Sequence, residues 1–85
     1  MSSTVTARFF SIARDIAGAD TIEIDVDGPI TISELLSREP LKSVIEGLRN
    51  RGVEPIVLVN GERVEANSIV RPGDEVAVLP PSSGG

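Results

Sequence analysis

Residues 56–64 read IVLVNGERV, and the Asn60-Gly61 pair in this segment is the strongest turn signal of the chain. Asparagine and glycine tolerate the positive φ angles that a two-residue hairpin turn requires. The apolar run at 56–59 before the turn and residues 62–64 after it are therefore predicted to form two antiparallel strands. A β-hairpin in the second half of the chain is the starting point for the fold.

Toward the C-terminus, the hairpin is followed by another turn and another strand. After a loop through Asn67, residues 71–74 (RPGD) carry the proline and glycine that favour a tight turn. Residues 75–79 (EVAVL) place valine at every second position and are predicted to form the last strand. This strand ends at Pro80, because proline has no backbone N–H to donate to a neighbouring strand.

Toward the N-terminus, two further strands are predicted. Residues 4–10 and residues 21–26 alternate apolar with polar side chains, as expected for strands with one buried face. Residues 14–18 between them are expected to form a turn, and this short connection indicates that the two strands pair as a hairpin. Residues 27–29 (DGP) close the second strand.

A helix is predicted between the two hairpins. The Thr31 hydroxyl and the Glu34 carboxylate have the spacing that satisfies free backbone N–H groups at a helix start. Pro40 is expected to kink the helix or to restart it at Glu39. The helix ends at Gly52. Its apolar face after the proline consists of Leu41, Val44, Ile45 and Leu48.

The element order ββαβββ indicates an α+β fold. A right-handed crossover between the two halves places the first and last strands side by side and parallel, with the helix over the apolar face of the sheet. This arrangement is a β-grasp, a mixed sheet of four to five strands packed on one main helix. We expect residues 1–79 to form this domain and residues 80–85 to form a flexible C-terminal Gly-Gly tail.

Composition narrows the classes of function. With 40% hydrophobic and 25% charged residues, the chain lies in the range of folded globular domains. Its net charge of −5 argues against nucleic acid as a partner, because phosphate binding needs clustered Lys and Arg. The absence of cysteine and histidine removes thiol nucleophiles, the usual zinc sites and imidazole proton transfer. With no signal-peptide pattern and no membrane-spanning apolar run, a soluble, cytoplasmic protein is expected.

The tail is the candidate for chemistry. It consists of Pro80, Pro81, Ser82, Ser83, Gly84 and Gly85. The two prolines favour an extended chain, and glycine fits a narrow channel because it has no Cβ. The Gly85 carboxylate becomes an electrophile once its oxygen is made a good leaving group, for instance by adenylation, which a partner must supply. The alternative is a frayed terminus without a role, as is common for Ser and Gly near chain ends.

Four segments carry a resemblance to a known family: residues 9–18 (FFSIARDIAG), 58–61 (LVNG), 72–76 (PGDEV) and 80–85 (PPSSGG). With these segments, and over nearly its whole length, the chain resembles the small, sulfur-carrying subunit of molybdopterin synthase, within the ubiquitin-like β-grasp superfamily. Ser82 departs from the family pattern, because the family often has an apolar residue such as valine at this position.

The resemblance implies a function for the tail. In that family a ubiquitin-activating-type enzyme adenylates the terminal glycine with ATP, and the glycine is then converted to a thiocarboxylate with the help of a sulfur-donating enzyme. The thiocarboxylate donates sulfur to a pterin precursor on the large subunit of molybdopterin synthase. By resemblance this role falls to Gly85, with residues 80–84 in the partner's channel. The chain would be a non-catalytic sulfur-donor subunit that itself binds no cofactor and no metal.

A partner-binding surface is predicted beside the tail. If Phe9 points into the core, Phe10 points to the opposite face of the sheet, and the same alternation places Leu79 outward. In the parallel pairing Phe10 and Leu79 become neighbours near the root of the tail and could anchor a docking enzyme. The alternative is that the strand ends at Phe9 and Phe10 turns back into the core. An acidic fringe for a basic partner, or a set of merely solvated charges, is formed by Glu62, Glu65, Asp74 and Glu75.

Three other functions stay open. The chain could be a ubiquitin-like modifier attached through Gly85 to lysines of other proteins, since this requires the same activated acyl group. It could be a sulfur carrier for thiazole or another metabolite, although those carriers commonly lack the Pro-Pro pair. It could also be a β-grasp binding module whose tail has no role. Lys42 is the only lysine, so little conjugation onto the chain itself is available.

Overall fold

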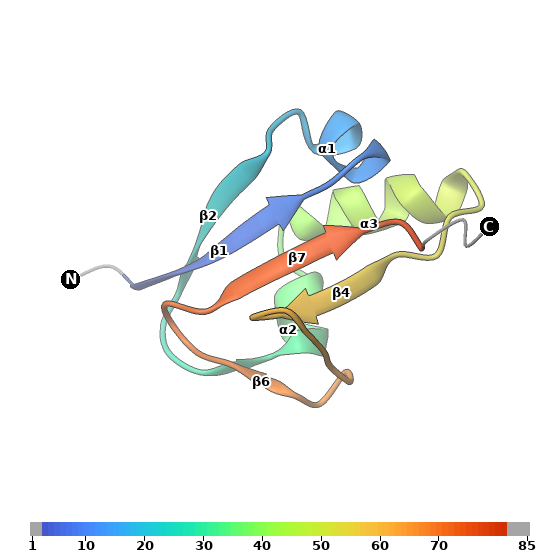
Figure 1. Cartoon of the computed structure of the whole chain (residues 1–85). Coiled ribbons are helices and arrows are strands. Elements are labelled where there is room, and N and C mark those ends of the chain that lie inside the picture. The colour runs from blue at the N-terminus through green and yellow to red at the C-terminus, as the bar shows by residue number, and fades with distance from the viewer. Residues whose placement is uncertain (1–2, 82–85) are drawn as a thin grey trace.

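Five strands form the main sheet of the computed structural model, which describes residues 3–81 (Figure 1). Their order is β2-β1-β7-β4-β5, with β1 and β7 parallel and the other neighbouring pairs antiparallel. The predicted parallel contact between the first and last strands is therefore confirmed. The strands are β1 (Ser3–Phe9), β2 (Thr21–Val26), β4 (Ile56–Val59), β5 (Glu62–Arg63) and β7 (Glu75–Leu79).

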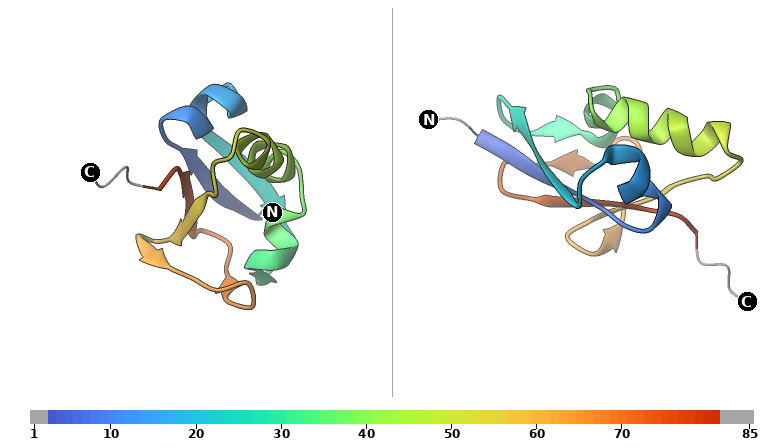
Figure 2. Two further views of the ribbon diagram at one scale, coloured as in Figure 1. Left: turned by 90° about the vertical axis from the view of Figure 1, so that its right-hand side faces the viewer. Right: turned by 90° about the horizontal axis from the view of Figure 1, so that it is seen from above.

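The helices lie on one side of this sheet. Figure 2 shows α3 lying along one face, while none of the described helices covers the opposite face. α3 buries its predicted apolar residues, so the arrangement is the expected β-grasp, of class α+β. The helices are α1 (Ile12–Ala17), α2 (Ile32–Leu36) and α3 (Leu41–Asn50).

The chain between β2 and β4 forms two separate helices. Thr31 caps α2 as predicted, because its Oγ1 accepts a hydrogen bond of 3.1 Å from the backbone N–H of Glu34. Pro40 is the N-cap residue of α3, so the helix restarts at the proline rather than kinking. Gly52 lies just beyond the end of α3 with a φ of +77°, the left-handed conformation that ends helices.

The expectation of a turn at 14–18 is wrong, because α1 occupies most of this segment. Six residues are too few for a helix that is stable alone in water, so packing must stabilise it. Ile16 of α1 packs on α3 at Gly47, where a Cβ would lie only 3.0 Å from Ile16 Cγ2. The strand before α1 ends at Phe9, one residue earlier than expected, and the chain turns at Ser11 with a φ of +56°.

The sequence pattern does not indicate the second, two-stranded sheet. β3 (Ile30–Thr31) pairs antiparallel with β6 (Ile69–Val70). A strand of two residues is too short to show a period in the sequence. β5 is equally short, and it ends at Arg63, one residue earlier than predicted.

An aliphatic core fills the space between the main sheet and α3. Val5, Ala7 and Phe9 of β1 are buried there, as are Val76 and Val78 of β7. The inward and outward alternation predicted for both strands is therefore confirmed. Among residues 3–81 no polar or charged residue is buried, so hydrophobic packing holds the helix to the sheet.

Candidate functional site

The face of the sheet that no described helix covers is apolar around the end of β7. Ile56 of β4 pairs with Leu79 of β7. Leu58 pairs in the same way with Ala77. Directly paired residues project from the same face, and the alternate residues of β7 are buried in the core, so these side chains point away from it. All four are partly exposed. Together with Phe10 they are named the apolar patch.

Phe10 is the aromatic member of the apolar patch. Its side chain is 43% exposed, and its backbone N–H donates a hydrogen bond of 3.2 Å to the carbonyl oxygen of Val78. Phe9 and Val78 are partners in the parallel register, so Phe10 and Leu79 lie one position further along the two strands. The outward orientation predicted for Phe10 is confirmed, and the alternative in which it turns back into the core is wrong.

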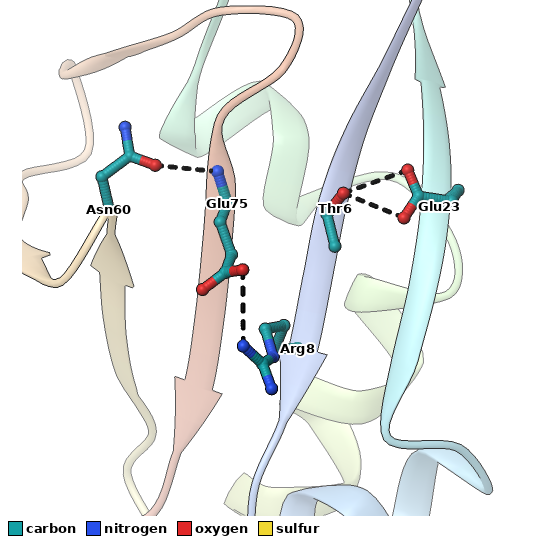
Figure 3. Close-up of polar contacts among 5 residues, drawn as sticks. All are labelled: Thr6, Arg8, Glu23, Asn60 and Glu75. Atoms are coloured by element: carbon teal, nitrogen blue, oxygen red, sulfur yellow. Dashed lines mark hydrogen bonds and ion pairs between the residues drawn. The ribbon is translucent and has the colours of Figure 1, made fainter.

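Arg8 lies between the apolar patch and the polar residues of the same sheet face. These residues, Thr4, Thr6, Glu23 and Glu75, are named the polar half. The central carbon of its guanidinium lies 5.8 Å from the centroid of the Phe10 ring, within the range of a cation–π contact. Its Nη1 lies 3.5 Å from Oε2 of Glu75 on the neighbouring strand (Figure 3). Both charged side chains are about half exposed, so the ion pair orients the arginine but adds little to stability.

Hydrogen bonds order the polar half. The Thr6 hydroxyl lies 3.0 and 2.9 Å from the two carboxylate oxygens of Glu23, and the Thr4 hydroxyl donates to the same carboxylate at 2.9 Å. Oδ1 of Asn60 accepts the backbone N–H of Glu75 at 3.0 Å (Figure 3). The polar half thus has hydrogen-bond partners within the domain, whereas the apolar patch keeps Phe10 exposed and its four other members partly exposed.

Asp74 holds the turn that precedes β7. Its Oδ2 accepts the backbone N–H of Arg71 at 2.9 Å, and its Oδ1 accepts a side-chain N–H of Asn60 at 3.2 Å. These hydrogen bonds favour the charged carboxylate and lower the pKa of Asp74, with the bond from Arg71 contributing most. Within the predicted acidic fringe, Asp74 and Glu75 therefore have partners that order the local structure.

The structure brings three of the predicted site residues together at one end of the sheet. Phe10 and Leu79 are neighbours there, and Pro80, which is partly exposed, follows directly after β7. Pro81 is exposed. The other predicted tail residues lie outside the described range: Ser82, Ser83, Gly84 and Gly85.

Sequence reasoning found Phe10 and Leu79 but missed Ile56 and Leu58. The run at 56–59 is apolar throughout, so its pattern does not say which residues face outward. The pairing register of β4 with β7 fixes the face, and this register joins segments that are separated in the chain. The two-residue turn after the run was the one local signal that could have shown which of its residues face outward.

Some kinds of site are not found within residues 3–81. No helix of this range is long and apolar enough to cross a membrane. The same range holds no group of three or more His, Cys, Asp or Glu side chains that could bind a metal ion. Because the whole sequence lacks histidine and cysteine, imidazole or thiol chemistry at the apolar patch must come from another protein.

The fold and the apolar patch at the end of β7 define a ubiquitin-like protein of the β-grasp class. Comparison with known families narrows this class, because the ThiS family model matches residues 7–85. The chain belongs to the ThiS family. The matched range includes Gly84 and Gly85 as well as most of the domain.

Two known relatives are similar over most of the chain. Small archaeal modifier protein 1 of Haloferax volcanii is 33% identical over 84 residues, which cover 92% of this chain and 97% of that protein. Its crystal structure has a TM-score of 0.75 at 30% identity and covers 96% of this chain and 99% of that one. The molybdopterin synthase sulfur carrier subunit of Drosophila simulans is 32% identical over 81 residues, or 91% of this chain and 86% of the relative. The second relative confirms the resemblance seen in the sequence.

Proposed function

We propose that this chain is a sulfur-carrier protein that acts as the small subunit of a molybdopterin synthase. One observation carries the proposal: the apolar patch lies at the end of β7, where the tail leaves the domain. A partner that docks on the patch has the tail within reach of its own active site. Similarity to a molybdopterin synthase sulfur carrier subunit over 91% of the chain supports the same role.

The chemistry proposed for Gly85 begins with a better leaving group. An adenylating partner of the ubiquitin-activating type transfers AMP from ATP to the carboxylate and releases pyrophosphate. A sulfur-donating enzyme then supplies sulfur at the oxidation level of sulfide, which attacks the carbonyl carbon. The bond from this carbon to the phosphate oxygen breaks, AMP leaves with the electron pair, and a thiocarboxylate remains. On the large subunit, this group gives its sulfur to a pterin precursor. These steps take place in the cytoplasm, where ATP is available.

The chain itself contributes docking and presentation. Gly84 and Gly85 have no Cβ and therefore suit a narrow channel. Pro80 and Pro81 restrict the backbone between the domain and the glycines. Acid–base groups must come from the large subunit, because the chain has no histidine or cysteine.

Docking is assigned to the apolar patch and its charged border. Phe10 and Leu79 offer apolar side chains that a partner can cover, and Arg8 is already oriented beside the aromatic ring. The net charge of −5 favours a partner with a basic surface, since complementary charge increases the rate of encounter.

Deletion of Gly85 in the source organism tests this function. We expect the molybdenum cofactor content of the cells to fall to the level of a strain that lacks the whole protein. Ile69→Ala, at an exposed position on β6 outside the tail and the apolar patch, is the control and should keep normal cofactor content. Normal cofactor content in the Gly85-deletion strain, at an unchanged level of the protein, would contradict the proposed role.

A ubiquitin-like modifier is the second candidate. It is favoured by the 33% identity to small archaeal modifier protein 1, over 92% of this chain and 97% of that relative. The activated carbonyl of Gly85 would then react with lysine amines of other proteins. Adducts linked through Gly85 in cell extract, absent after deletion of this residue, would support the modifier. An extract of the natural strain without such adducts would exclude it.

A further inference from the structure

A groove runs between the helices and the β4–β5 hairpin. It has a volume of about 570 Å³, and none of its lining residues belongs to the apolar patch. This volume is within the range of sites that hold small ligands or chain segments. The apolar side chains of its lining include Ile32, Leu36, Ile45, Val57 and Val64.

Lys42 lies at the rim of this groove, in the first turn of α3, and is exposed. The ion pairs found within residues 3–81 all involve arginine, and none involves Lys42. Glu39, three residues earlier, instead accepts the backbone N–H of Ser43 at 3.0 Å. In the described part of the chain, no carboxylate holds the Lys42 ammonium group in direct contact.

Lys42 is also chemically distinct from every other basic residue of the chain. The sequence has eight lysine and arginine residues, and Lys42 is the only lysine. A guanidinium stays protonated in proteins, whereas a lysine amine can lose its proton and act as a nucleophile. The one side-chain amine that could be acylated therefore stands beside a groove whose lining combines apolar side chains with the polar or charged residues Ser33, Ser37, Glu46, Arg49 and Glu65.

We propose that Lys42 is an acceptor site for a second copy of this chain. The tail of the donor copy lies in the groove, and its Gly85 becomes joined to Lys42 by an isopeptide bond. This inference rests on the proposed function, because it needs the same activated Gly85. It adds to that function a named acceptor residue and a named docking groove.

The composition and length of the tail suit the groove. Residues 80–85 carry no charged side chain, and the rings of the two prolines match the apolar part of the lining. The lining also includes Arg49, and α3 rises by about 10 Å between Lys42 and Arg49. Fully extended, residues 80–85 span at most about 20 Å. A donor tail can therefore run the length of the groove while its own domain stays outside.

The bond forms by acyl transfer without any oxidation or reduction. Nζ of Lys42, as the free amine, attacks the carbonyl carbon of the Gly85 adenylate of the donor copy. A C–N bond forms, and the bond from this carbon to the phosphate oxygen of AMP breaks. AMP leaves with the electron pair, and the amine loses a proton to solvent.

Mass spectrometry of the full chain expressed in its own organism tests the inference. We expect a species of twice the chain mass less one water. Trypsin does not cut the Arg71-Pro72 bond or a lysine that has been acylated. The digest should therefore contain a branched peptide with residues 64–85 of the donor on Lys42 of the acceptor.

Three variants separate the acceptor residue from the groove. Lys42→Arg keeps the positive charge but removes the amine, and it should abolish the dimer while leaving sulfur on Gly85 unchanged. Lys42→Arg combined with Arg51→Lys moves the amine to an exposed position that does not line the groove, and the dimer should stay absent. Ala66→Trp narrows the groove but keeps Lys42, and it should lower the yield of dimer about tenfold.

The outcomes separate this inference from the proposed function. Sulfur on Gly85 without a dimer linked through Lys42 would overturn the inference and leave the carrier function standing. Absence of every activated form of Gly85, together with absence of the dimer, would overturn both. A dimer linked through position 51 in the double variant would show that any exposed lysine suffices, and would overturn the role of the groove.

Discussion

Arg8 has two neighbours on the open face of the sheet, the Phe10 ring at 5.8 Å from its centroid and the Glu75 carboxylate at 3.5 Å. Contacts of this kind between exposed groups add little to the stability of the domain. They do reduce the freedom of the arginine before a partner arrives, which lowers the entropy cost of binding. At the scale of single residues, these contacts serve docking more than folding.

Replacing Phe10 by alanine should weaken binding to the large subunit by about tenfold or more, because aromatic residues in docking surfaces carry much of the binding energy. The free energy of unfolding should change by less than about 1 kcal/mol, since the ring is not part of the core. Isothermal titration calorimetry and urea unfolding measure the two quantities.

The matched control for this variant is Ile69→Ala. Ile69 is 45% exposed, close to the 43% of Phe10, but it lies on β6 in the two-stranded sheet. The control should bind as the natural chain does. If Phe10→Ala also kept the natural affinity, the apolar patch would have no part in docking.

Asp74→Asn should remove a pH-dependent part of the stability. In the folded chain, hydrogen bonds from Arg71 and Asn60 lower the pKa of Asp74. Such a group stabilises the fold above its unfolded pKa, about 3.9 for aspartate, and this contribution is lost as pH falls through the folded value. The variant should be less stable than the natural chain at neutral pH, and the difference should shrink as the pH falls below the unfolded pKa of about 3.9. Urea midpoints over this range check the expectation, which a pH-independent difference would contradict.

At the scale of elements, the start of α2 depends on one side chain. Thr31 Oγ1 accepts the backbone N–H of Glu34 at 3.1 Å, so Thr31→Ala leaves that donor without its cap. We expect Thr31→Ala to lower the free energy of unfolding by about 1 kcal/mol. Thr31→Ser should retain most of the natural stability, because serine can also cap the helix. Equal urea midpoints for the alanine and serine variants would show that the cap does not stabilise the helix.

Elements with local signals could be predicted from the sequence. The last strand, the Asn60-Gly61 turn and the Thr31 cap each depend on residues close in the chain, and the structure has them where they were expected. α1 depends instead on its packing at Gly47 of α3, and the small sheet depends on pairing of β3 with β6. No local pattern contains such long-range contacts.

The candidate site likewise contains some residues that the sequence predicts and others that it does not. The orientation of Phe10 and Leu79 follows from the two-residue period of a strand, which the sequence displays. The orientation of Ile56 and Leu58 follows only from their pairing with β7, because their own segment is apolar throughout. A surface to which several strands contribute can therefore be predicted only in part from the sequence. The pairing register decides which of the remaining residues belong to it.

At the scale of the whole molecule, the residues that hold the fold are separate from those proposed for transfer. The buried hydrophobic residues found within the described range all lie between Val5 and Val78. Deletion of Gly85 should therefore change the free energy of unfolding by less than about 0.5 kcal/mol, while transfer of sulfur is lost. Thermal unfolding of the purified variant checks the first part. A large drop in stability would mean that the tail helps to hold the domain.

The proposed function depends on sulfur being carried at the carbonyl carbon of Gly85. Intact-mass spectrometry of the chain isolated from its own cells detects this sulfur. We expect a form in which sulfur replaces one terminal oxygen, and we expect this form to disappear when Gly85 is deleted. Chains that carry only the ordinary carboxylate, isolated from cells actively making the cofactor, would contradict the claim.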